Sequence, residues 1–128
     1  MSTWHALYYP IKRGSEDAVK KLFATSGRPQ FEITAPDGTV VGRLLATMAF
    51  VGEGAAIRVI EVDGPLPVVA AHMSRQPEVK EFERQLEEHL TEERDMLSPE
   101  GARAFFQKAG MENVLNRRAP AAAGEKAA

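Results

Sequence analysis

The sequence predicts one α+β domain in which an antiparallel sheet carries helices on one face. Three observations predict it. Aromatic and β-branched segments alternate with amphipathic helical segments in the order strand, helix, strand, strand, helix, short helix, strand. Two of the strands flank a glycine-containing turn, and both faces of that pair are largely apolar. A chain of 128 residues can also bury a core of its own. This order of elements is that of a ferredoxin-like βαββαβ unit.

The first elements follow from local signals. The segment WHALYYPIK (4–12) predicts a strand that ends near Pro10, because aromatic residues favour strands and proline disfavours their interior. The segment GSEDAVKKLFATSG (14–27) predicts a helix with Ser15 as its N-cap and Gly27 as its end. Residues 31–34 and 39–41 surround a Pro-Asp-Gly turn and predict a small hairpin or flap.

The clearest strand pair is 44–51 with 55–62, joined by a three-residue turn. Pairing Val51 with Ala55 is expected to place on one face Leu44, Ala46, Met48, Phe50, Ala56, Arg58, Ile60 and Val62. Because both faces are mostly apolar, each needs a cover. Helices can cover one face, and we expect the other to line a cavity or to meet a second copy in a homodimer.

The second half of the chain is mainly helical. Residues 66–75 predict one helical segment, and Pro77 breaks or restarts the helix before the amphipathic segment 78–90. Ser98 and Pro99 predict the start of a short helix that ends at Gly110. Residues 111–118 are expected to form the last strand. The domain would therefore span residues 1–118, followed by an Ala-rich flexible tail at 119–128.

Composition excludes several classes of function. The chain has no cysteine, which removes disulfides, thiolate catalysis and Cys-based zinc sites. A net charge of −2 argues against a nucleic-acid partner. No apolar run reaches the ~18 residues of a membrane helix, and the first ten residues do not look like a signal peptide, so we expect no membrane association and a cytoplasmic location.

Three longer segments carry a family resemblance. WHALYYPIKRG (4–14), RVIEVDG (58–64) and SPEGARAFFQKAGMENVLNRR (98–118) resemble the SchA/CurD-like family, which is associated with aromatic polyketide biosynthesis. The helical segment 69–90, with its alanine-histidine pair, resembles the wider dimeric α+β barrel superfamily. The resemblance implies a homodimeric barrel that acts on an aromatic polyketide without a cofactor. It implies a cyclase, with a cofactor-independent quinone-forming monooxygenase or a non-catalytic polyketide-binding partner of the synthase as alternatives.

Ring closure needs a base and a donor that stabilises an enolate, and histidine suits the first of these roles. His72, near the start of the second helical region, is one candidate base; the other reading is a hydrogen-bonded histidine between helix and sheet. His5 and Tyr9 share a strand face about 13 Å apart and could act as base and phenolic donor. If that face looks toward the helices instead, Trp4 and Tyr8 would line the cavity.

Arg58 is the most informative charge, because it lies mid-strand among apolar residues, where a lone buried cation is unfavourable. It must pair with a carboxylate, reach the mouth of the barrel, or bind an anionic or enolate oxygen. Met48 and Phe50, on the neighbouring strand, are expected to add apolar contacts to the substrate. No histidine pair has metal-ligand spacing, so no metal is expected. The charged run 78–94 is interpreted as the outer face of a helix.

Overall fold

The computed structural model describes residues 2–96 and 98–120. Its strands are β1 (Ser2–Pro10), β2 (Glu32–Thr34), β3 (Val40–Gly52), β4 (Ala55–Asp63) and β5 (Gly110–Met111). Its helices are α1 (Glu16–Ala24), α2 (Leu66–Arg75), α3 (Pro77–Leu86), a 3-10 turn η1 (Glu87–His89) and α4 (Pro99–Ala109). In the described part of the chain, no helix is long and apolar enough to cross a membrane.

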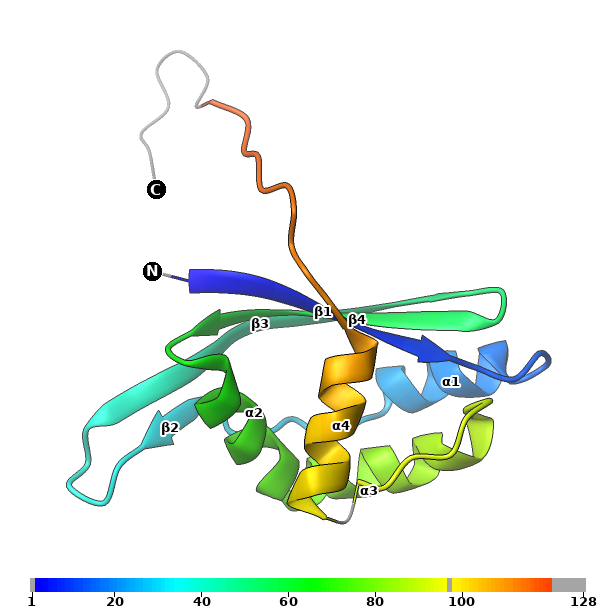
Figure 1. The fold of residues 1–128 in the computed structure, drawn as a ribbon, viewed down its shortest axis with the longest axis horizontal. Helices are drawn as coiled ribbons and strands as arrows, with labels where there is room; N and C mark the ends of the chain where they lie inside the picture. Colours follow the sequence, from blue (N-terminus) through cyan, green and yellow to red (C-terminus); the bar gives the residue numbers. More distant parts are fainter. Residues whose placement is uncertain (1, 97, 121–128) are drawn as a thin grey trace.

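The predicted α+β fold is confirmed. The strands form one antiparallel sheet in the order β2-β3-β4-β1-β5. Without the short edge strand β2, this is the strand order of the ferredoxin-like βαββαβ unit. Figure 1 shows all four helices on one side of the sheet, which we call the helix side; the opposite side is the open side. After β5 the chain extends away from the body of the molecule on the open side (Figure 1).

Most helix boundaries agree with the local signals. Pro77 starts α3, and the extended backbone of Gln76 separates it from α2. The Ser98 hydroxyl caps α4 by accepting a hydrogen bond from the Gly101 N–H at 3.0 Å. The first helix was predicted to end at Gly27, but α1 ends at Ala24, where Thr25 donates its hydroxyl to a carbonyl of the last turn.

The predicted register of the main strand pair was wrong by one residue. Val51 pairs with Ala56, and Gly52 pairs with Ala55, so a two-residue turn replaces the expected three-residue turn. Gly54 makes this turn possible with a φ of +70°. Since neighbouring residues of a strand point to opposite faces, the shift moves Met48 and Phe50 away from the face that carries Arg58. An irregularity between Leu44 and Ala46 then returns Leu44 to the side of Val62.

Two other segments differ from expectation. The predicted hairpin is present, but its second arm continues without a break into β3, so that one strand of 13 residues pairs with both β2 and β4. The predicted last strand, 111–118, is reduced to Gly110–Met111, and residues 112–120 form no helix or strand. Most of the predicted tail, residues 121–128, lies outside the described residues.

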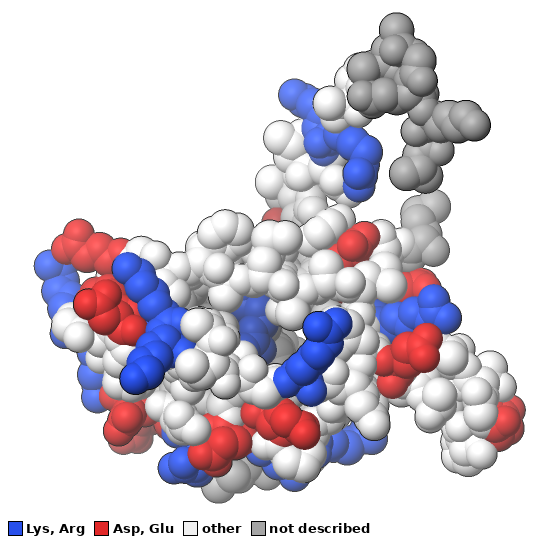
Figure 2. Space-filling model, turned by 180° about the vertical axis from the view of Figure 1, so that it is seen from behind, with Lys and Arg blue, Asp and Glu red and all other residues white. Residues whose placement is uncertain are grey.

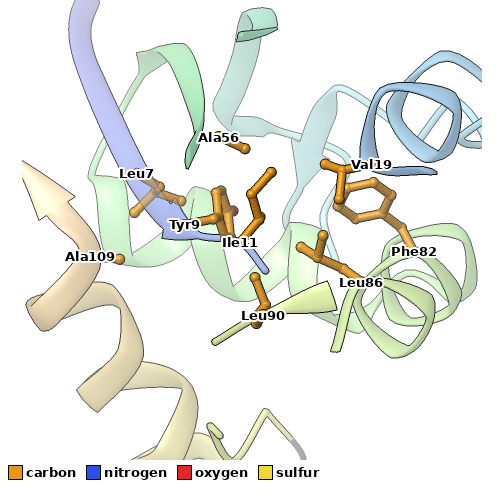
Figure 3. Close-up of a cluster of buried hydrophobic side chains, with 9 residues drawn as sticks. All are labelled: Leu7, Tyr9, Ile11, Val19, Ala56, Phe82, Leu86, Leu90 and Ala109. Carbon is orange, nitrogen blue, oxygen red and sulfur yellow. The ribbon is translucent and has the colours of Figure 1, made fainter. Parts of the chain in front are cut away.

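The core lies between the sheet and the helices, in two clusters. Figure 3 shows the larger cluster, in which β1 side chains meet α1, α3 and the end of α4; its members are Leu7, Tyr9, Ile11, Val19, Ala56, Phe82, Leu86, Leu90 and Ala109. The smaller cluster is formed by Ile33, Leu44, Val62 and Val69. Burying these apolar side chains supplies most of the stabilisation of the fold. The clusters therefore anchor the sheet at two places and leave the stretch between them less covered.

Candidate functional site

The sheet separates the candidate residues into two groups. His5 and Tyr9 lie on the helix side, because each is two residues from the buried Leu7 and therefore points to the same face. Arg58 lies on that side too, because it pairs with Leu7. The open side carries the other strand candidates: Trp4, Tyr8, Met48 and Phe50. These two groups cannot line one pocket within a single copy of the chain. His5 and Tyr9 face the helices, which is the case in which the sequence placed Trp4 and Tyr8 at the cavity. Trp4 and Tyr8 instead lie on the side of the sheet that no helix covers among the described residues, whereas the hollow described next lies on the helix side.

A hollow lies on the helix side between the two core clusters. There, Thr47 pairs with Ile60 and Ala49 pairs with Arg58, so that all four side chains share one face. Thr47 and Ala49 are exposed although this face carries helices, which means that the helices leave the middle of β3 uncovered. Figure 2, seen from behind, shows a depression near the middle of the molecule with basic atoms at its floor.

Arg58 is held at this hollow by aromatic rings rather than by a carboxylate. Its guanidinium carbon lies 4.8 Å from the ring centre of Phe82 and 5.4 Å from that of Phe23. No carboxylate within residues 2–96 and 98–120 forms an ion pair with it. Two rings from different helices thus orient a half-buried cation whose charge stays available to a ligand.

Tyr9 is a hydrogen-bond donor beside this cation. Its side chain is buried, and burial raises the pKa of its phenol to about 12, an effect that the nearby Arg58 charge partly opposes. The phenol therefore stays protonated at neutral pH and can donate a hydrogen bond. Within the described part of the chain, the Tyr9 hydroxyl forms no hydrogen bond.

The two candidate bases lie in different places. His5, half-buried on β1, is paired with Ile60, and its Nε2 lies 2.8 Å from the Thr3 hydroxyl. It is a diagonal neighbour of Arg58 on the adjacent strand, about 7 Å away. His72, on α2, has its Nε2 3.3 Å from the carbonyl oxygen of Gln30.

His72 and its neighbour Gln76 bind the connection between α1 and β2 through Gln30. The side-chain amide of Gln76 donates to the same Gln30 carbonyl at 3.0 Å, and its oxygen accepts from the Gln30 N–H at 2.7 Å. His72 and Gln76 together hold the backbone of Gln30 against α2. The His72 contact is to the connection before β2 and not to a strand, so the role of His72 stays a prediction.

Sequence reasoning missed Arg94. The run 78–94 was expected to be solvated, but the Arg94 side chain is only 6% exposed and forms ion pairs with Glu83 and Glu87. Its guanidinium carbon lies 4.5 Å from the Phe105 ring centre and 5.9 Å from that of Tyr9. One signal could have indicated this: Arg94 is the only basic residue between Glu92 and Asp95, in a stretch that otherwise carries negative charge.

The open side is an apolar surface that no element among residues 2–96 and 98–120 covers. Three of its large side chains are substantially exposed: Tyr8 at 40%, Met48 at 44% and Phe50 at 57%. The segment that follows β5 adds Val114 and Leu115, which are 86% and 65% exposed. Exposed apolar side chains gathered on one face of a sheet are typical of a surface that packs against another molecule.

A pocket at the β3–β4 turn differs in character from the hollow. It is lined by charged residues, among them Arg13, Glu16, Lys20 and Glu53. The Glu16 carboxylate already accepts hydrogen bonds from the backbone of Gly14 and Gly54. The backbone N–H of Glu16 itself, followed by those of Gly54 and Gly14, lowers the pKa of the Glu16 carboxyl. The pocket is therefore built around the turn, with charged side chains and Val51 in its lining.

The comparisons with known proteins identify the family. The family model described as "SchA/CurD like domain" matches residues 2–118. The chain is 39% identical over 112 residues to "Polyketide synthase CurD" of Streptomyces cyaneus, covering 88% of this chain and 29% of that protein. It is 36% identical over 110 residues to "Protein SchA" of Streptomyces halstedii, covering 86% and 28%.

A third relative is the "42.8 kDa protein in whiE locus" of Streptomyces coelicolor, 33% identical over 124 residues. That match covers 95% of this chain and 30% of the relative, so the chain spans less than a third of the length of these three proteins. No solved structure matches the chain. With a family model that covers residues 2–118 and relatives 33% to 39% identical, the chain belongs to the SchA/CurD-like domain family.

Proposed function

We propose that this chain binds an aromatic polyketide, or its poly-β-ketone precursor, in the helix-side hollow and acts on it as a cyclase. The observation that carries the proposal is Arg58, a cation at the hollow held by Phe23 and Phe82 and not matched by a carboxylate among the described residues. The printed name of one relative, "Polyketide synthase CurD", supports the substrate class. Exposed apolar and small side chains around the arginine suit a flat ligand.

The proposed chemistry is an aldol-type ring closure. His5, as a neutral imidazole, takes a proton from a carbon between two carbonyl groups, and the enolate formed is stabilised by Arg58 and the Tyr9 hydroxyl. The enolate carbon then forms a bond to a second carbonyl carbon, the π bond of that carbonyl breaks, and its oxygen takes up the proton held by the His5 imidazolium, which returns to its neutral form. Because the phenol of Tyr9 stays protonated, it serves as a donor and not as the base.

The same donors would stabilise a phenolate, so a cofactor-independent, quinone-forming oxygenation is the second candidate. Oxygen uptake by the purified chain with an anthrone substrate separates the two: consumption of oxygen supports oxygenation, and its absence with conversion of a poly-β-ketone supports cyclisation. The third candidate is a polyketide-binding partner of the synthase that does no chemistry.

A genetic experiment tests the proposal. The gene is deleted in the organism that encodes it and is restored as wild type or as Arg58→Gln, His5→Ala, His72→Ala or Arg84→Gln. Under the proposal, Arg58→Gln and His5→Ala change the polyketide products by mass spectrometry. The Arg84→Gln control, which alters an exposed residue paired with Glu81, leaves them unchanged.

Unchanged products for both Arg58→Gln and His5→Ala would contradict catalysis in the hollow. A binding partner without chemistry would instead lose its effect when the hollow is filled, for example by Ala49→Trp. His72→Ala is expected to have the smaller effect, because His72 contacts a backbone carbonyl that Gln76 also holds.

We also propose that two copies pack through the open side to form a homodimer. The support is the apolar surface that includes Trp4, Tyr8, Met48 and Phe50, which no element of the chain covers within the described residues. In that arrangement these four residues stabilise the dimer, and the substrate contacts stay on the helix side.

A further inference from the structure

The Arg94 guanidinium has a donor that the fold does not use. Its Nε and Nη2 contact Glu87 and Glu83, whereas its Nη1 is buried without a hydrogen-bond partner. Leaving such a donor unpaired in the interior is unfavourable, and native proteins rarely do so without a water molecule or a ligand. The side chain is also held in place by two carboxylates, so it cannot turn out into solvent without breaking both ion pairs.

A second unused donor lies beside it. Arg94, Tyr9 and Phe105 are in mutual contact: the Tyr9 and Phe105 ring centres are 5.6 Å apart, and the guanidinium carbon lies over both rings. The Tyr9 hydroxyl has no hydrogen-bond partner among residues 2–96 and 98–120. The buried Nη1 of Arg94 and the unpaired Tyr9 hydroxyl thus belong to two side chains in contact, and the charges of both Arg58 and Arg94 act on the Tyr9 phenol.

The charges decide what kind of group fits. Arg94 is matched by Glu83 and Glu87, so it offers a hydrogen bond with little net positive charge. Arg58 is the cation without such a match. All three groups are donors, so the ligand must supply acceptors. A phosphate dianion would meet Glu83 and Glu87 nearby, whereas two oxygens that share at most one negative charge would not be repelled as strongly.

Building on the proposed function, we infer that the unused Nη1 of Arg94 and the Tyr9 hydroxyl bind one oxygen of the ligand while Arg58 binds another, so that the site selects a β-dicarbonyl or the equivalent hydroxy-ketone. This assigns Arg94 as a specificity-determining residue.

The test compares two ligands that differ by one oxygen. The purified full chain is titrated with 2-acetonaphthone and with 1-hydroxy-2-acetonaphthone, which carries the hydroxyl next to the ketone. The wild type is expected to bind the hydroxy-ketone more tightly by about three- to tenfold, the range that one added hydrogen bond supplies. Tyr9→Phe and Arg94→Lys should each bring this ratio close to one. Arg84→Lys, an exposed arginine with one carboxylate partner, should keep the wild-type ratio.

The results separate this inference from the proposed function. If both ligands bind but the ratio is the same in the wild type and both variants, a permanently bound water occupies the two donors and the inference is wrong. If neither ligand binds the wild type, the proposed function fails. Thermal unfolding then decides the inference: Tyr9→Phe should unfold at the wild-type temperature or above it, and a clear decrease would mean that the hydroxyl is satisfied within the fold.

Discussion

At the scale of single residues, burial controls the chemistry of Tyr9. A phenol in water ionises near pH 10, but in the larger cluster the charged form would lose its hydration, so its pKa rises to about 12. The unfolded chain therefore releases the Tyr9 proton at lower pH than the folded chain. Stability that depends on the neutral phenol is present below pH 10 and is lost as the pH rises from 10 toward 12.

This shift predicts a difference between the wild type and Tyr9→Phe at alkaline pH. Two pKa units correspond to about 3 kcal/mol of unfolding free energy, lost in full only near pH 12. Urea unfolding at pH 8, 10 and 11 should show that the variant loses less stability than the wild type as the pH rises. Parallel curves for the two proteins would show that Tyr9 ionises at its ordinary pKa.

Arg94 predicts a stability effect rather than a pH effect. Replacing it by alanine leaves Glu83, whose side chain is only 13% exposed, without its cation, so the unfolding free energy should fall by about 3 kcal/mol. The matched control is Arg84→Ala, because Arg84 pairs with Glu81 at the surface, where ion pairs contribute little. Equal urea midpoints for the two variants would contradict the buried role of Arg94.

At the scale of elements, the turn between β3 and β4 decides which residues share a face. Gly54 adopts a φ of +70°, a backbone conformation that residues other than glycine rarely adopt. Its N–H donates to Glu16 at 3.0 Å, and its carbonyl accepts from Ile11 at 3.1 Å, so the turn is also tied to the start of α1. The conformation of this one glycine therefore fixes the register that brings Ala49 opposite Arg58.

Gly54→Ala should consequently lower the unfolding free energy by about 1 kcal/mol, from backbone strain alone, since an added Cβ would meet no atom within 4 Å. Gly52→Ala is the control in the same turn. It too would meet nothing within 4 Å, but its φ is not positive, so its stability should be unchanged or slightly raised. Chemical unfolding of both variants is sufficient, and an equal loss in both would exclude strain at Gly54 as the cause.

The same turn shows what the sequence could and could not predict. The starts of α3 and α4 were predicted correctly because caps and prolines act over a few residues, as at Pro77 and Ser98, whereas the predicted strand 111–118 is only Gly110–Met111. The register was not, because Gly52-Glu53-Gly54 is compatible with a two- or a three-residue turn, and the difference of one residue reverses a face. Arg94 was missed for another reason: its burial depends on where the loop after η1 folds back.

At the scale of the whole molecule, the sheet has two apolar sides with different covers. The helix side combines a packed core with a hollow, whereas the open side exposes Met48 and Phe50 together with the apolar residues of the segment after β5. The sequence predicted this two-sided character correctly even though it assigned Met48 and Phe50 to the wrong partners. The reason is that apolar residues occupy both faces of β3, so a shift of one residue leaves both faces apolar.

If a second copy covers the open side, charge placed there should separate the copies. Phe50→Asp and Met48→Asp each put a carboxylate into the proposed interface, where it would lose hydration without gaining a partner. Both variants should therefore sediment as single copies at concentrations where the wild type sediments as a dimer. Val68→Asp is the control: Val68 is 40% exposed, similar to Met48, but lies on α2 on the helix side, so this variant should remain dimeric. Because none of the three side chains is buried within one copy, each chain should keep its circular dichroism spectrum. A wild type that sediments as a single copy at tens of micromolar would show that water or another protein covers the open side. The proposed homodimer would then be wrong, whereas the assignment of Arg58 to the helix-side hollow would stand.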